Sequence, residues 1–82
     1  MATVFRSYRL YRVAVNSNDH TPAHVHAYGP KLEARFKLNC PDGPVEYWDH
    51  EGRWSLQHLR ELGVEIAERL TECCKTWKDI HG

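Results

Sequence analysis

The sequence predicts a small α+β fold, in which an antiparallel sheet of three to four strands packs on one long or split C-terminal helix. Apolar and polar residues alternate through much of the first half of the chain, as they do in half-buried strands. From Ser55 onward, apolar residues instead recur every three or four positions, which is the period of an amphipathic helix. Because 82 residues can enclose only one modest core, we expect a single domain over residues 1–82.

The strands are expected between well-marked turns. β-branched and aromatic residues favour a first strand, which ends at the polar, turn-forming residues 16–22. Gly29 and Pro30 separate the next two strands, and the Pro-Asp-Gly-Pro run at 41–44 is the strongest turn signal in the chain. The strand after that turn is expected at a sheet edge, because proline cannot donate to a central ladder. The expected strands are residues 9–15, 24–28, 33–38 and 45–48.

The helix is expected to begin after Ser55, which is a favourable N-cap residue. Gly63 interrupts its apolar stripe at a cost of about 1 kcal/mol relative to alanine, so a bend or a split is expected there. Trp77 lies on the stripe and is expected in the core, whereas His58 and His81 lie off it and are expected to be exposed. The stripe consists of Leu56, Leu59, Leu62, Ile66, Leu70, Cys73, Trp77 and Ile80.

The cysteines are an odd number without a Cys-x-x-Cys spacing: Cys40, Cys73 and Cys74. We expect them to be reduced thiols of a cytoplasmic protein. Cys73 and Cys74 cannot bond to each other on a helix, since adjacent side chains point about 100° apart. No apolar run is long enough to span a membrane, and the arginines among residues 1–15 argue against a signal peptide.

Charge is unevenly distributed along the chain. The formal net charge is zero, yet residues 1–38 carry +4 and residues 39–82 carry −4. Such a division can orient a charged partner, although the two halves can equally neutralise each other across the core. The acidic residues of the helix share one face, which is either solvated or a docking surface for a basic partner: Glu61, Glu65, Glu68 and Glu72.

The most distinctive segment is residues 18–29, which holds three of the six histidines, His20, His24 and His26. Pro22 disfavours a helix for the residue before it and so favours an extended chain. Residues two apart in a strand point to the same face, so His24 and His26 are expected side by side. Such a pair can serve as metal ligands, as an acid–base pair or as polar surface.

A hairpin through residues 29–32 extends this face to a second strand. Its symmetrical register places every polar side chain on one face and every apolar side chain on the other. The register pairs His24 with Lys37, His26 with Arg35, and Tyr28 with Glu33. The apolar face, which is expected to receive the helix, consists of Val25, Ala27, Ala34, Phe36 and Leu38.

The first interpretation of the polar face is metal-free acid–base chemistry on a phosphodiester. His24 and His26 would be the catalytic acid and base. Arg35 and Lys37, from the opposite strand, would hold the phosphate. The other residues assigned to binding are Asp19 and His20, which would orient an imidazole, and Tyr28, whose hydroxyl could contribute.

Two other interpretations compete with this one. Asp19, His20 and the two strand imidazoles are suitable ligands for zinc or another first-row metal, but the adjacent cations would repel it. No metal ligand is therefore assigned, and no cofactor is expected. The residues could also form the solvent face of an ordinary antiparallel sheet, where histidine, arginine, lysine and glutamate are common neighbours.

The same segment resembles a bacterial family known as domain of unknown function 4160. The resemblance lies in the Asn-Asp-His-x-Pro-x-His-x-His run at residues 18–26, in Tyr-Gly at 28–29 and in Glu-Ala at 33–34, and it extends to the spaced leucines and late tryptophan of the C-terminal helix. It implies a cytoplasmic bacterial protein in a toxin–antitoxin-like setting, with a small protein partner and RNA as a target.

We therefore expect the histidine face to bind an anion or RNA phosphodiester; if the protein is an enzyme, the same face would cleave the phosphodiester by metal-free acid–base chemistry. The alternative is a non-catalytic, antitoxin-like binding module that acts through a small protein partner. Because an edge strand is expected, either a monomer or a homodimer is compatible with the sequence. No association with a membrane is expected.

Overall fold

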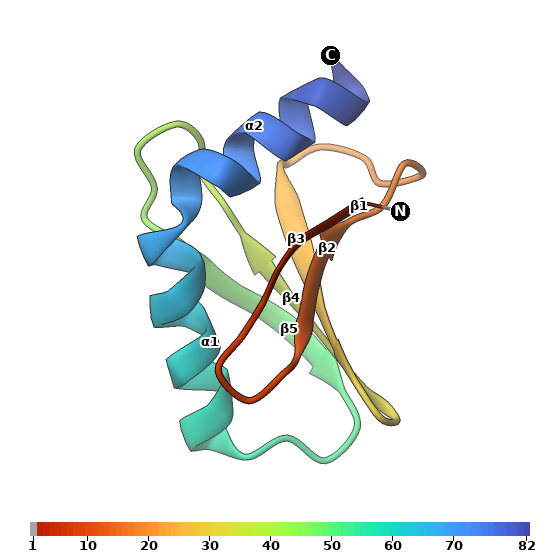
Figure 1. Cartoon of the computed structure of the whole chain (residues 1–82), viewed down its shortest axis with the longest axis vertical. Helices are drawn as coiled ribbons and strands as arrows, with labels where there is room; N and C mark the ends of the chain where they lie inside the picture. Colours follow the sequence, from red (N-terminus) through yellow and green to blue (C-terminus); the bar gives the residue numbers. More distant parts are fainter. Residues whose placement is uncertain (1) are drawn as a thin grey trace.

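Residues 2–82, which the computed structural model describes, form a five-stranded antiparallel sheet and two C-terminal helices (Figure 1). The strand order in the sheet follows the chain, so every connection is to a neighbour. In Figure 1, α1 runs alongside the sheet and α2 crosses one end of it. The elements are β1 (Ala2–Arg6), β2 (Arg12–Val15), β3 (His24–Gly29), β4 (Leu32–Lys37), β5 (Glu46–Glu51), α1 (Leu56–Glu68) and α2 (Leu70–His81).

The predicted α+β class is confirmed, but the prediction of three to four strands is wrong because it omits β1. This strand pairs antiparallel with β2, with Ala2 opposite Val15. A five-residue segment carries little alternation of its own, and it becomes a strand by pairing with its neighbour. The strand expected from residue 9 begins only at Arg12, since residues 7–10 form the turn between β1 and β2.

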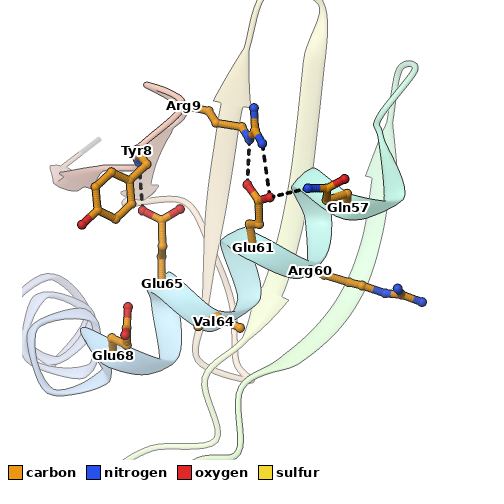
Figure 2. A pocket seen from close by; sticks show the side chains of 8 residues that line it. All are labelled: Tyr8, Arg9, Gln57, Arg60, Glu61, Val64, Glu65 and Glu68. Atoms are coloured by element: carbon orange, nitrogen blue, oxygen red, sulfur yellow. Dashed lines mark hydrogen bonds and ion pairs between the residues drawn. The ribbon is translucent and has the colours of Figure 1, made fainter.

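This turn is tied to α1 (Figure 2). Arg9 Nε donates a hydrogen bond to Glu61 at 2.7 Å, and the Tyr8 backbone N–H donates to Glu65 at 2.9 Å. Gln57 Nε2 donates to the other Glu61 oxygen at 3.0 Å. Two of the acidic residues expected on a free helix face are therefore used within the chain.

The predicted register of the β3–β4 hairpin is confirmed. His24 lies opposite Lys37, and His26 lies opposite Arg35. At the turn, a Cβ on Gly29 would lie 2.9 Å from the Tyr11 ring, so only glycine fits there. The pairing of β4 with β5 shifts between Arg35 and Phe36. Arg35 lies opposite Asp49 and Phe36 lies opposite Tyr47, so Trp48 is an extra residue in β5, and Tyr47 and Asp49 point to opposite sides of the sheet.

The hydrophobic core lies between the helices and the face of the sheet that carries Val25, Ala27 and Phe36. All five residues predicted for the apolar face of the hairpin are buried in it. Leu56, the first residue of the predicted stripe, is instead 64% exposed, because it begins α1 beyond the edge of the core. The buried helix residues are Leu59, Leu62, Ile66 and Cys73.

The helical segment is split, but not at Gly63. That residue lies inside α1, and the break falls at Arg69, which leaves helical geometry with φ −113° and ψ 24°. The apolar spacing continues through the break, so periodicity does not reveal it. His58 and His81 are partly buried rather than exposed, since His58 Nδ1 contacts Tyr11 Oη at 2.9 Å and His81 Nε2 contacts the Asn16 carbonyl at 3.1 Å.

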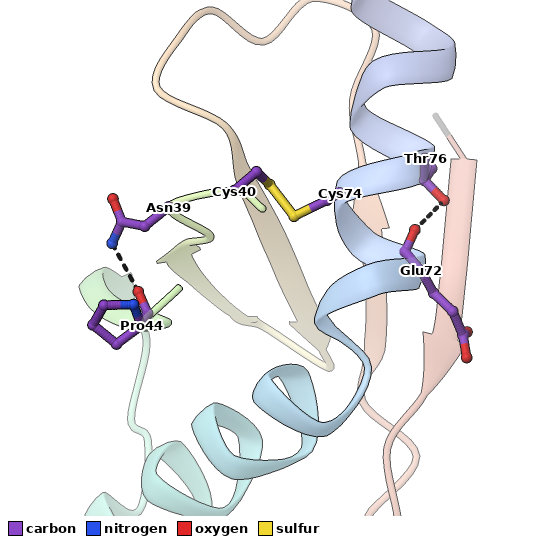
Figure 3. The surroundings of a disulfide bond; sticks show 6 residues. All are labelled: Asn39, Cys40, Pro44, Glu72, Cys74 and Thr76. Atoms are coloured by element: carbon purple, nitrogen blue, oxygen red, sulfur yellow. Dashed lines mark hydrogen bonds between the residues drawn. A yellow bond between two sulfur atoms is a disulfide. The ribbon is translucent and has the colours of Figure 1, made fainter. Parts of the chain in front are cut away.

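The expectation of three reduced thiols is wrong. Cys40, in the loop after β4, forms a disulfide with Cys74 of α2, across a sequence separation of 34 (Figure 3). The folded chain brings the two Cα atoms to 5.9 Å, a proximity that sequence spacing cannot show. Cys73 is a buried free thiol. Within residues 2–82, neither helix is long and apolar enough to cross a membrane.

Candidate metal centre

Two buried histidines form the middle of the candidate site. His24 and His26 project from the face of β3 opposite the apolar core, and they are only 3% and 7% exposed. The loop that precedes β3 folds back beside them. In that loop the Asp19 backbone N–H donates to the Asn16 carbonyl at 3.2 Å, and the Asn16 N–H donates to Asp19 Oδ2 at 3.1 Å. For these two histidines, the interpretation as a solvent-exposed sheet surface is therefore wrong.

The Asp19 carboxylate faces both imidazoles. Both of its oxygens lie 3.1 Å from His26 Nε2, and Oδ2 lies 3.5 Å from His24 Nε2. One ligand atom from each of the three residues can be chosen so that all lie within 4.8 Å of one another. Ligand atoms held at about 2.0–2.2 Å from one metal ion lie about 3–3.5 Å apart. Both contacts of the carboxylate already have this spacing.

The other nitrogen of each imidazole is held by an oxygen acceptor. His24 Nδ1 lies 2.8 Å from the carbonyl oxygen of Pro22, and His26 Nδ1 lies 2.8 Å from Glu33 Oε2. The Pro22 carbonyl can only accept, so Nδ1 of His24 carries a proton; Glu33 likewise accepts from Nδ1 of His26, whose Nε2 faces a second carboxylate, Asp19. An imidazole that donates from one nitrogen to a carbonyl or carboxylate is the usual arrangement of a histidine metal ligand.

This hydrogen bonding sets the chemistry of the two Nε2 atoms. A neutral imidazole with its proton on Nδ1 presents a lone pair at Nε2. In His24 and in His26, that lone pair faces the oxygens of Asp19, and lone pairs on both sides repel. Two species relieve this repulsion, namely a proton on each Nε2 or a single metal ion between the three groups. A divalent ion satisfies all three ligands at once.

Carboxylates dominate the electrostatics around His26. Burial raises the pKa of Asp19, but the hydrogen bond that His26 donates when its Nε2 is protonated, the first of the two species above, and the hydrogen bond from the Asn16 N–H outweigh it, so this pKa lies below its ordinary value. Glu33 lies on the other side of the ring. Two carboxylates flanking one imidazole favour a cation over an anion at this position.

Aromatic rings enclose the two imidazoles. The Trp48 ring meets His24 edge-on at 5.0 Å between centroids, and the Trp77 ring of α2 lies 5.4 Å from it. The Tyr28 ring stacks on His26 at 5.7 Å with an interplanar angle of 4°. Burial raises the pKa of Tyr28, whose hydroxyl accepts a hydrogen bond from Asn16. These apolar walls limit the access of water and strengthen the interactions inside the centre.

The two predicted phosphate-binding cations, Arg35 and Lys37, both contact the Trp48 ring, and Arg35 is also paired with a carboxylate. Arg35 forms a bidentate ion pair with Asp49, with 2.7 Å between Nε and Oδ1, and its guanidinium stacks on the Trp48 ring at 4.1 Å. The hydrogen bond to Asp49 raises the pKa of Arg35. Lys37 Nζ lies 4.9 Å from the same ring centroid. The repulsion of a metal ion that the sequence suggested is therefore weakened, because the charge of Arg35 is already paired.

The structure brings together most, but not all, of the residues that the sequence singled out. Asp19 and Tyr28 contact the two histidines directly. His20 follows Asp19 in the chain but is exposed. Within residues 2–82, the side chains close enough to share one metal ion are Asp19, His24 and His26, without His20. A polar pocket of about 190 Å³ lies beside His26, lined further by Glu33, Arg35, Asp49, His50 and Glu51.

Four residues of the site were not assigned from the sequence: Glu33, Trp48, Asp49 and Trp77. Glu33 was placed on the correct face, and its diagonal position from His26 across the hairpin was a usable signal. The irregularity in the β4–β5 pairing sets the side of the sheet to which Trp48 and Asp49 point, and the path of α2 brings Trp77 to His24. Neither of these is a periodic feature of the sequence.

Comparison with protein-family models, with curated proteins and with solved structures finds no match for this chain. Membership of the family known as domain of unknown function 4160 therefore stays a prediction.

Proposed function

We propose that this protein binds a divalent first-row transition-metal ion through Asp19, His24 and His26. One observation carries the proposal. Two buried imidazoles donate from Nδ1 to the Pro22 carbonyl and to Glu33, and both direct Nε2 at a single carboxylate. With both rings neutral, only a cation between the three groups satisfies that arrangement. The other species, protonated on each Nε2, would bury two imidazolium charges whose ring centroids are 5.1 Å apart.

The ligand types narrow the class of metal. Two imidazole nitrogens with one carboxylate suit zinc, iron(II) and related ions, whereas magnesium and calcium prefer oxygen ligands. Three protein ligands also leave at least one coordination position for water or a substrate. When bound, such an ion supplies Lewis acidity and lowers the pKa of a coordinated water.

Metal-free cleavage of a phosphodiester by His24 and His26 receives less support. Asp19 and Glu33 flank His26 with negative charge, and Arg35 is paired with Asp49. A phosphate would approach this surface against the field of the carboxylates. The RNA target, the toxin–antitoxin setting and the small protein partner stay predictions from the resemblance.

The test is the metal content and metal affinity of protein that carries no histidine tag. After EDTA treatment and desalting, we expect Co²⁺ and Zn²⁺ to bind with a stoichiometry of one ion per chain. Co²⁺ should produce the visible absorption of a nitrogen- and oxygen-ligated site. Asp19→Asn and His26→Gln should abolish both signals.

His20→Gln is the matched control, because His20 belongs to the same segment but is exposed and outside the centre. This variant should bind as the wild type does. Absence of stoichiometric binding, or equal binding by the His26→Gln protein, would contradict the proposal. Incubation with labelled RNA in EDTA tests the competing interpretation, which requires cleavage by the wild type that His24→Ala loses.

A further inference from the structure

We propose that the Cys40–Cys74 disulfide regulates the metal centre, because it holds α2 in the position from which this helix supports two of the three ligands. The inference rests on the proposed metal binding. In the disulfide form the centre is enclosed and binds its ion tightly. In the dithiol form α2 is released at that end, and the centre loses affinity.

The first route from the disulfide to the centre runs through Trp77. Cys74 and Trp77 lie three residues apart in α2, so they occupy the same side of the helix. The Trp77 ring lies 5.4 Å from the His24 ring. A shift of α2 at Cys74 therefore moves the wall against which His24 is held.

The second route runs through the end of α2. The His81 ring lies 4.0 Å from the Trp77 ring, and its Nε2 lies 3.1 Å from the Asn16 carbonyl oxygen. The same carbonyl accepts the hydrogen bond from the Asp19 N–H, and the Asn16 N–H donates to the Asp19 carboxylate. Movement of α2 thus reaches a second metal ligand through Asn16.

The other half of the disulfide is anchored beside the centre. Cys40 follows β4 closely, and the Leu38 N–H donates to the Ala23 carbonyl at 2.9 Å, next to His24. The disulfide therefore connects α2 to the end of the β3–β4 hairpin that carries His24 (Figure 3).

The junction at the start of α2 is suited to movement. A single non-helical residue, Arg69, separates α2 from α1, and α2 has no side-chain N-cap hydrogen bond. Only Cys73 is fully buried among the residues of α2, whereas α1 buries three apolar side chains. The disulfide is the one covalent restraint, among residues 2–82, that fixes α2 to the sheet.

The redox step needs a dithiol reductant as its co-reactant. The reductant supplies two electrons and two protons, the bond between the sulfur atoms of Cys40 and Cys74 breaks, and two thiols form while the reductant becomes a disulfide. Cys40 lies in an exposed loop, where a thiolate can attack. Cys73 is not the exchanging thiol, since burial raises its pKa to about 12.

The experiment compares metal affinity in the two redox forms of the same protein. Zn²⁺ affinity is measured by competition with a chromophoric chelator, before reduction and after treatment with dithiothreitol followed by alkylation of the freed thiols, so that Cys40 and Cys74 cannot themselves bind Zn²⁺. Thiol titration and circular dichroism establish the redox state and the fold. We expect the affinity to fall by about 10-fold or more on reduction, as it does when support of a metal ligand is lost.

Two variants keep the test decisive if the reduced chain unfolds. Trp77→Leu retains the disulfide, so it should bind Zn²⁺ about 10-fold more weakly than the wild type without reduction. Cys73→Ala, on the same helix, should keep both the wild-type affinity and the response to dithiothreitol. Equal affinity of the two redox forms, or wild-type affinity in Trp77→Leu, would overturn the inference and leave the metal site intact. Absence of binding by the disulfide form would overturn the proposed function itself.

Discussion

Glu33 offers a quantitative test of how the centre is built. Its Oε2 lies 2.8 Å from His26 Nδ1, an interaction that orients the ring and makes Nε2 a stronger donor to a metal. Loss of such an outer partner typically weakens metal binding by about 10- to 100-fold. Because the Glu33 side chain is 39% exposed, water screens its charge and the lower part of this range applies.

Two substitutions separate the charge of Glu33 from its hydrogen bond. Glu33→Gln keeps an oxygen acceptor but loses the charge, so we expect about 10-fold weaker Zn²⁺ binding, which is about 1.4 kcal/mol. Glu33→Ala also loses the acceptor, so its affinity should fall further, to about 30-fold below that of the wild type. The measurement is a chelator competition titration at constant ionic strength.

Glu51→Gln is the matched control for this series. Glu51 lies directly opposite Glu33 on β5 and is exposed, so the substitution changes the net charge equally without touching the hydrogen bond to His26. It should leave the affinity within about 2-fold of the wild type, the effect of an exposed charge that solvent screens and that makes no hydrogen bond to a ligand. Wild-type affinity in Glu33→Ala, or equal losses in Glu33→Gln and Glu51→Gln, would refute the reasoning.

Three further predictions concern the fold. Ile66→Ala empties a fully buried position and should cost about 2–5 kcal/mol, with a fall in Tm of about 10 °C or more, whereas Val64→Ala, at a 60% exposed position of the same helix, should be nearly neutral. Reduction of the disulfide, with its sequence separation of 34, should cost about 3–4 kcal/mol in urea unfolding by the chain-entropy model; an unchanged midpoint would show that the bond does not constrain the unfolded chain. The hydrogen bonds from Arg9 and Gln57 hold the pKa of Glu61 at about 2, below its ordinary value of 4.5. Glu61 therefore stabilises the fold above pH 4.5 and loses this contribution as the pH falls toward 2, so the Tm difference from Glu61→Gln should shrink over that range, and a constant difference would contradict the assignment.

Local patterns were sufficient for the hairpin that carries the site. The alternation of residues 24–28 and 33–38 predicted the face of His24 and His26 and the pairing of His26 with Arg35, all of which the structure confirms. Strand β1 and the helix break at Arg69 were not predicted. The first is too short to show a pattern, and the second leaves the apolar spacing undisturbed.

By itself, the sequence determined which side chains share a face, because the periods of strands and helices are properties of the backbone. Only the tertiary structure decided what those side chains meet. The loop before β3 brings Asp19 to both imidazoles, and α2 carries Trp77 to His24 and Cys74 to Cys40. These contacts join segments distant in the chain, and their positions follow from packing against one core rather than from any local preference. The same packing buries the two histidines, and burial turns a polar strand face into a candidate metal centre.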